Sequence, residues 1–82
     1  MFCQWNRSAE EDAKDQRLTV DQVDKIVGSK FSAGETYEFD RLRGTHATRF
    51  NHSGKRYIVE FTVDTQNNRP WIQAIEQESE DF

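Results

Sequence analysis

Hydrophobic and polar residues alternate most regularly over residues 56–64, where polar neighbours mostly separate Tyr57, Val59, Phe61 and Val63. Successive side chains of a β-strand point to opposite faces, so this spacing of two places the four side chains on one face of an extended chain. The pattern therefore predicts a central strand whose apolar face lies in the core.

A segment with helical spacing lies upstream of this strand. Its apolar residues recur at intervals typical of one helix face: Val20, Val23, Ile26 and Val27. Thr19 is a favourable N-cap, and Gln22 stands three residues later, where it completes a capping box. Gly28 is a natural C-terminal stop. We expect a short amphipathic helix of about two turns that is stabilised by packing on the sheet.

Further strands are predicted on both sides of the central one. Residues 36–42, 45–50 and 71–76 favour extended structure, and Asn51-His52-Ser53-Gly54 has the composition of a hairpin turn. We expect this turn to join the second strand to the central strand. The predicted class is α+β, with one short helix packed on a three- to four-stranded antiparallel meander and with mobile acidic termini.

A chain of 82 residues has room for one domain with a modest core. We expect an N-terminal tail or weak solvated helix over residues 1–17, a single α+β domain over 18–76 and an acidic C-terminal tail over 77–82. The N-terminal segment shows no apolar helix face, but the aromatic side chains of Phe2 and Trp5 need a surface to lie on.

The net charge of −4 conceals an uneven distribution. Lys and Arg number 5 against 9 Asp and Glu in residues 1–40, 6 against 2 in residues 41–71, and 0 against 4 in residues 72–82. A basic middle between acidic ends is a clue to partners rather than to the fold. A solvated sheet face and two mobile tails that happen to differ in sign explain the same pattern.

Cys3 is the single cysteine, so the chain forms no internal disulfide and no cysteine-rich metal site. The first residues are too short and polar for a signal-peptide core, and no apolar run approaches the roughly 18–20 residues that span a bilayer. We therefore expect a cytoplasmic protein that does not enter the membrane.

Catalytic chemistry has few candidates. His46 and His52 are the only histidines, and a nuclease-like acid/base pair with Arg49 or Lys55 holding a phosphate is the one enzymatic arrangement to weigh. Exposed histidines at the end of a hairpin explain the same residues more simply. No metal-ligand spacing and no glycine-rich phosphate loop occurs in the sequence. We predict that the protein is not an enzyme and binds neither cofactor nor metal.

The candidate binding surface is basic and centred on the predicted hairpin. Its residues are Arg41, Arg43, His46, Arg49, His52, Lys55, Arg56 and Arg69. Aromatic residues lie between these cations, an arrangement suited to stacking on single-stranded RNA or DNA. The overall acidity and the acidic tails oppose phosphate binding.

The preferred hypothesis is a small non-catalytic module that regulates through binding another protein, since segments of both charges and exposed aromatic residues suit a protein interface. Two alternatives stay open: binding of RNA or single-stranded DNA by the basic hairpin, and an acidic mimic of nucleic acid formed by residues 10–15 and 76–81. A homodimer through an edge strand at residues 71–76 also stays open.

Overall fold

A computed structural model of the protein describes residues 1–78. Residues 79–82, which make up most of the predicted acidic C-terminal tail and part of the predicted acidic mimic, lie outside the described residues. Its strands are β1 (Gln4–Trp5), β2 (Tyr37–Asp40), β3 (Thr45–His52), β4 (Lys55–Asp64) and β5 (Arg69–Gln77). Its helices are α1 (Arg7–Asp15) and α2 (Val20–Ser32). None of the helices in this described part is long and apolar enough to cross a membrane.

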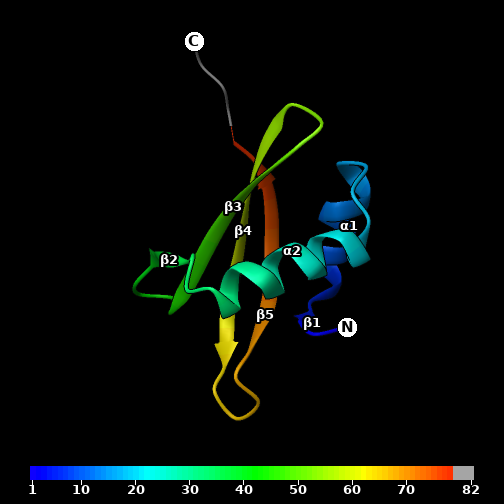
Figure 1. Cartoon of the computed structure of the whole chain (residues 1–82). Coiled ribbons are helices and arrows are strands. Elements are labelled where there is room, and N and C mark those ends of the chain that lie inside the picture. Colours follow the sequence, from blue (N-terminus) through cyan, green and yellow to red (C-terminus); the bar gives the residue numbers. More distant parts are fainter. Residues whose placement is uncertain (79–82) are drawn as a thin grey trace.

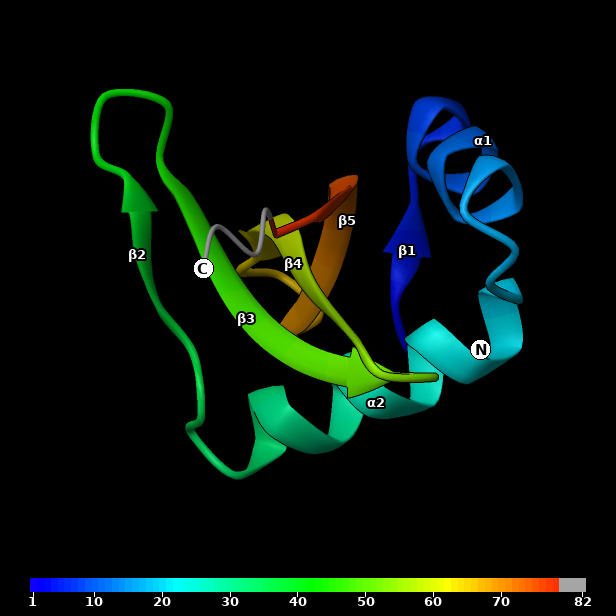
Figure 2. The same cartoon turned by 90° about the horizontal axis from the view of Figure 1, so that it is seen from above.

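The strands form one sheet in the order β1-β5-β4-β3-β2. The four strands from β2 to β5 make an antiparallel meander, and β1 joins it in parallel beside β5. Helix α2 crosses one face of the sheet, and α1 lies beyond β5 (Figure 1). The view from above shows the β2–β3 turn and α1 at opposite ends of the sheet (Figure 2). The predicted α+β class is confirmed.

The core lies between α2 and the predicted central strand, which is β4. Tyr57, Val59 and Phe61 are 2%, 0% and 0% exposed, and they belong to the same buried cluster as Val23 and Val27 of α2. The predicted inward face of this strand is therefore confirmed.

The predicted hairpin between β3 and β4 is also confirmed. His52 pairs with Lys55, which leaves Ser53 and Gly54 as a two-residue loop, and both have positive φ values of 52° and 76°. Two successive positive φ values make the type I′ geometry that matches the twist of the flanking strands.

Helix α2 begins as predicted but ends later. Thr19 and Gln22 form the complete capping box. Gly28, however, lies inside the helix, which continues to Ser32. A Cβ at Gly28 would stand 3.0 Å from Phe2 Cδ2, so this glycine makes room for the aromatic ring rather than ending the helix.

The structure has two helices and five strands instead of the predicted one helix and three to four strands, because the N-terminal segment adds β1 and α1. Helix α1 is the helix that was one of the two alternatives for residues 1–17. Cys3, Ala9 and Ala13 are buried in the core cluster, so this end of the chain packs on the domain instead of forming a mobile terminus. The apolar strip of α1 consists of two alanines, which is too slight to reveal an amphipathic helix in the sequence.

The expected edge strand at residues 71–76 is instead internal, because β5 lies between β4 and β1. Beyond the two-residue β1, polar side chains of α1 and of its C-cap residue Gln16 form hydrogen bonds with the backbone of β5. Asp12 Oδ2 accepts from Ile75 N at 3.1 Å, and Gln16 Nε2 donates to Ile75 O at 2.8 Å. This edge is therefore covered, while β2 is the outer strand on the other side.

Candidate functional site

The β2–β3 arm, which we define as residues 37–44, carries Leu42, the most exposed large hydrophobic residue of the described part of the chain. Its turn is closed by Asp40, whose Oδ1 accepts from Leu42 N at 3.1 Å and from Arg43 N at 3.2 Å. Gly44 adopts φ of 68° and donates its N–H to Arg41 O at 3.3 Å. A carboxylate that bonds the backbone two and three residues onward makes a well-defined turn.

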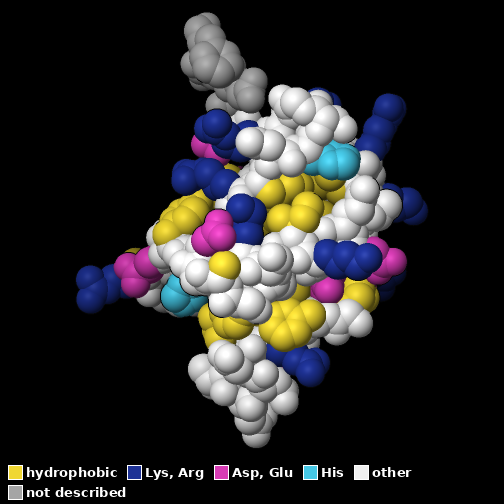
Figure 3. Space-filling model, viewed as in Figure 1, with side chains coloured by type: hydrophobic (Ala, Val, Ile, Leu, Met, Phe, Trp, Pro, Cys, Tyr) yellow, Lys and Arg dark blue, Asp and Glu magenta, His cyan; other side chains and the backbone are white. Residues whose placement is uncertain are grey.

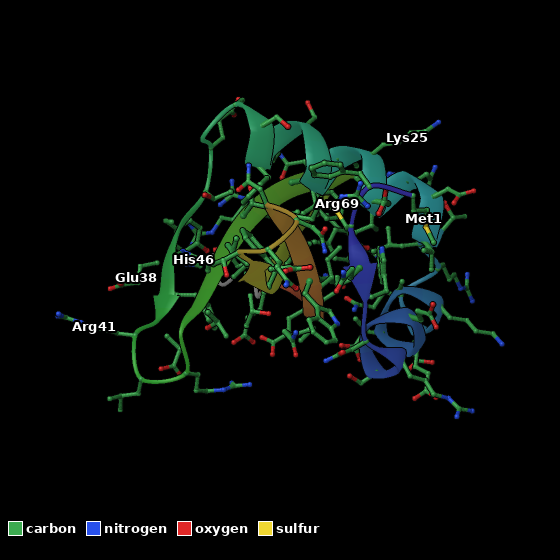
Figure 4. The ribbon with its side chains drawn as sticks, turned by 90° about the horizontal axis from the view of Figure 1, so that it is seen from below. Met1, Lys25, Glu38, Arg41, His46 and Arg69 are labelled. Carbon is green, nitrogen blue, oxygen red and sulfur yellow. The ribbon has the colours of Figure 1, made fainter. Side chains whose placement is uncertain are left out.

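The arm holds apolar side chains out in solvent. Leu42 is 99% exposed and Phe39 is 45% exposed, the first of these at the tip of the closed turn. Arg41 points away from the body of the protein (Figure 4). The arm thus combines exposed apolar surface with exposed charges of both signs, Glu38 and Arg41, as protein-binding surfaces do.

The arm is tied to the sheet by two arginines. Arg43 Nη1 lies 3.4 Å from Glu60 Oε2 of β4. The guanidinium of Arg49 lies 4.9 Å from the centre of the Tyr37 ring, and its Nε donates to Glu78 Oε1 at 3.0 Å. These contacts position β2 as the outer strand, whose far edge has no strand partner within residues 1–78.

The structure does not bring the eight predicted surface residues together. Arg41 and Arg43 belong to the β2–β3 arm, whereas His52, Lys55 and Arg56 lie at or beside the β3–β4 turn. On the face shown in Figure 3, Lys and Arg side chains are scattered rather than gathered in one patch.

The remaining predicted residues have local packing roles. His46 stacks on Phe61, with ring centres 5.9 Å apart, and therefore faces α2. Arg69 starts β5 and lies 5.7 Å from the centre of the Phe2 ring. Beside it is a cavity of about 630 Å³, which Phe31 and Asn67 also line.

A second candidate site is a groove of about 360 Å³ between α2 and the β3–β4 hairpin, which we call the hairpin groove. Its lining residues are Ile26, Lys30, Arg49, Phe50, Asn51 and Arg56. Figure 3 shows hydrophobic surface beneath the hairpin tip, bordered by basic side chains. The sequence prediction missed Lys30 because it ended the helix at Gly28; a longer helix would have carried Lys30 towards β3.

Two of the three cations of the hairpin groove already have carboxylate neighbours. Lys30 Nζ lies 3.8 Å from Glu35 Oε2, and Arg49 is bonded to Glu78. Glu78 is further held by its backbone N–H, which donates to Arg56 O at 2.8 Å. Any anion entering this groove must therefore compete with these acids.

The N-terminus is anchored by the buried carboxylate of Asp24, which is 4% exposed. It accepts from Phe2 N at 3.0 Å, Cys3 N at 2.9 Å and Trp5 Nε1 at 3.1 Å. Burial by itself raises the pKa of Asp24, but these donors outweigh it and hold the pKa below the ordinary value of 3.8. The anchor is a structural device and offers no reactive group.

The thiol of Cys3 is equally unsuited to chemistry. Burial, with the nearby charge of Asp24, raises the pKa of Cys3 to about 12. A thiol is a nucleophile only as the thiolate, so this cysteine is inert at neutral pH. Within residues 1–78, no group of three or more His, Cys, Asp or Glu side chains is placed to hold a metal ion.

Comparison with known proteins finds no matching family model, no matching curated sequence and no matching solved structure.

Proposed function

We propose that the protein is a small non-catalytic binding module that captures another protein through the β2–β3 arm. The observation that carries this proposal is Leu42, 99% exposed on a turn that Asp40 closes with two hydrogen bonds. The backbone of this turn is already ordered, so binding restricts little more than the side chain of Leu42, and burial of that side chain contributes to affinity. The single, buried cysteine suits action in the cytoplasm.

The outer edge of β2 suggests how the partner binds. An extended segment of the partner can add to a free strand edge through backbone hydrogen bonds, while side-chain contacts supply specificity. Phe39 and Leu42 would meet apolar side chains, and Arg41 would meet an acidic one. Complete burial of a leucine contributes about 1.5–3 kcal/mol, enough to change affinity tenfold or more.

Selection from a random peptide library on the immobilised protein tests this proposal. We expect selected peptides to combine apolar and acidic residues and to bind Leu42→Ser about tenfold more weakly than the wild type. Arg41→Glu should also weaken binding. Lys14→Glu, an equal charge reversal on the exposed side of α1, is the matched control and should have no effect. Failure to select peptides, or equal binding to Leu42→Ser, would contradict the proposal.

The hairpin groove supports a second candidate function, the binding of single-stranded RNA or DNA. Its three cations could contact successive phosphates, which requires displacement of Glu35 and Glu78. Fluorescence anisotropy with labelled oligonucleotides should then show affinity that falls with salt, with a flatter slope for Arg56→Glu than for Lys14→Glu. No binding at low salt would remove this candidate.

A further inference from the structure

The face of the sheet away from α2 carries a row of side chains that runs from β2 to β5. By strand register, Tyr37 pairs with Ala47, Ala47 with Glu60, and Glu60 with Ala74. The two alanines are short, so Glu60 is the central polar group of this row. Figures 2 and 4 show the β2–β3 turn and α1 standing at the two sides of this face.

Three oxygens of this face are buried without a hydrogen-bond partner within the described residues: Tyr37 Oη, Thr45 Oγ1 and Glu60 Oε2. Thr45 shares the face because it precedes Ala47 by two residues in β3. It is 2% exposed, and Glu60 is 8% exposed. Buried polar groups in native proteins nearly always have partners, so three unpaired oxygens on one face require an explanation.

The position of Arg43 indicates which kind of chemical group this face can bind. Its guanidinium lies 3.4 Å from Glu60 Oε2 and its side chain is 64% exposed, so most of it stays in solvent. The contact compensates the charge of Glu60 but leaves the hydroxyl groups of Tyr37 and Thr45 unpaired. Arg43 belongs to the turn of the arm, where its side chain can leave without disturbing the core.

We propose that this face is an arginine-accepting site, in which the guanidinium of an arginine from a protein partner replaces Arg43 beside Glu60. The Glu60 carboxylate and the two hydroxyls can accept hydrogen bonds, and a guanidinium supplies five N–H donors in one plane. A lysine ammonium is a compact charge and matches the two oxygens of a carboxylate less well than the planar guanidinium does. The inference rests on the proposed function, since it names a side chain of the partner that the arm captures.

The first test removes the side chain of Arg43 from the site and adds a small arginine analogue. Nuclear magnetic resonance titration of Arg43→Ser with N-acetyl-arginine amide should show binding about tenfold tighter than to the wild type, because the internal competitor is gone. N-acetyl-citrulline amide, which has the shape without the charge, should not bind. Adding Glu60→Gln to Arg43→Ser should abolish binding of the arginine probe. Equal binding of the two probes, or binding that survives Glu60→Gln, would overturn the proposal.

A second pair of variants separates binding from folding. Tyr37→Phe and Thr45→Val each remove a hydroxyl that has no partner, so the urea midpoint of the free protein should stay the same or rise. In the Arg43→Ser background, each should weaken the arginine probe severalfold. A lower midpoint with unchanged probe affinity would show a structural role for the hydroxyls and would overturn the proposal.

The two proposals fail in distinguishable ways. If the arginine probe binds but Leu42→Ser retains the selected peptides, the arm proposal fails alone. If the peptides depend on Leu42 while no arginine probe binds Arg43→Ser, the arginine-accepting site fails alone.

Discussion

At the scale of single residues, Asp24 anchors the N-terminal segment of the chain. Its carboxylate joins α2 to the N-terminal segment through three donors, two from the backbone and one from Trp5. Hydrogen bonds to a charged group contribute more than neutral ones, and a buried donor left unpaired is costly. Together with the packing of Cys3 and Trp5 on the core, this side chain holds the N-terminal segment on the domain.

Asp24→Asn should lower the free energy of unfolding at neutral pH by about 2–3 kcal/mol, because one carboxylate oxygen is replaced by an amide that cannot accept from Phe2 N. The fold holds the pKa of Asp24 below 3.8, so the carboxylate stabilises fully above that pH and loses its contribution as the pH falls through the folded value. Urea unfolding should therefore show the wild-type advantage shrinking below about pH 3.8.

Asp21→Asn is the matched control for this measurement, because Asp21 is exposed on the same helix. This substitution should lower the free energy of unfolding at neutral pH much less than Asp24→Asn does. An advantage of the wild type over Asp24→Asn that stays constant as the pH falls would contradict the role of the carboxylate charge.

At the scale of elements, Gly28 of α2 leaves the space in which Phe2 of the N-terminal segment packs. Gly28→Val should push the Phe2 ring away and destabilise the protein by roughly 1–3 kcal/mol, as overpacking does. Helix propensity alone predicts a slightly more stable protein, since valine is a slightly better helix former than glycine. Chemical denaturation of this variant measures the net change in the free energy of unfolding.

Ser29→Val provides the comparison, because Ser29 is the next residue of α2 and is exposed. It introduces the same side chain away from the buried side of the helix and should be nearly neutral. Equal destabilisation by both substitutions would mean that the Phe2 contact contributes nothing.

Elements with strong local patterns could be predicted from the sequence. The alternation from Tyr57 to Val63 and the Thr19–Gln22 capping box are local signals, and both are present in the structure. The continuation of α2 past Gly28 to Ser32 could not be predicted, because the role of this glycine depends on a ring 26 positions earlier in the chain. The role of α1 was equally hidden, since its apolar face is only two alanines and its hydrogen bonds to β5 come from the polar side chains of Asp12 and the C-cap residue Gln16.

The residues of the candidate site likewise include some that the sequence identified and some that it missed. Sequence reasoning identified Arg41 and Arg43 as surface cations but grouped them with residues at the other turns. It did not identify Leu42, whose importance lies in an exposure that only the folded turn creates. Nor did it identify Glu60 as buried, because alternation predicts a solvent-facing polar position on this strand.

At the scale of the whole molecule, the two ends of the sheet differ in how they meet solvent. Helix α1 and β1 cover the edge of β5, whereas β2 ends the sheet with the exposed side chains of the arm. Protection of one edge is a common means of avoiding unwanted strand pairing. We therefore expect a partner at β2 and not at β5.

The most direct measurement of this claim is an amide chemical-shift map of the protein with a selected peptide. The account predicts that the largest changes fall on residues 37–44, with extension to Glu60 when the peptide contains arginine. Changes confined to the hairpin groove around Lys30, Arg49 and Arg56, with the arm unaffected, would contradict it.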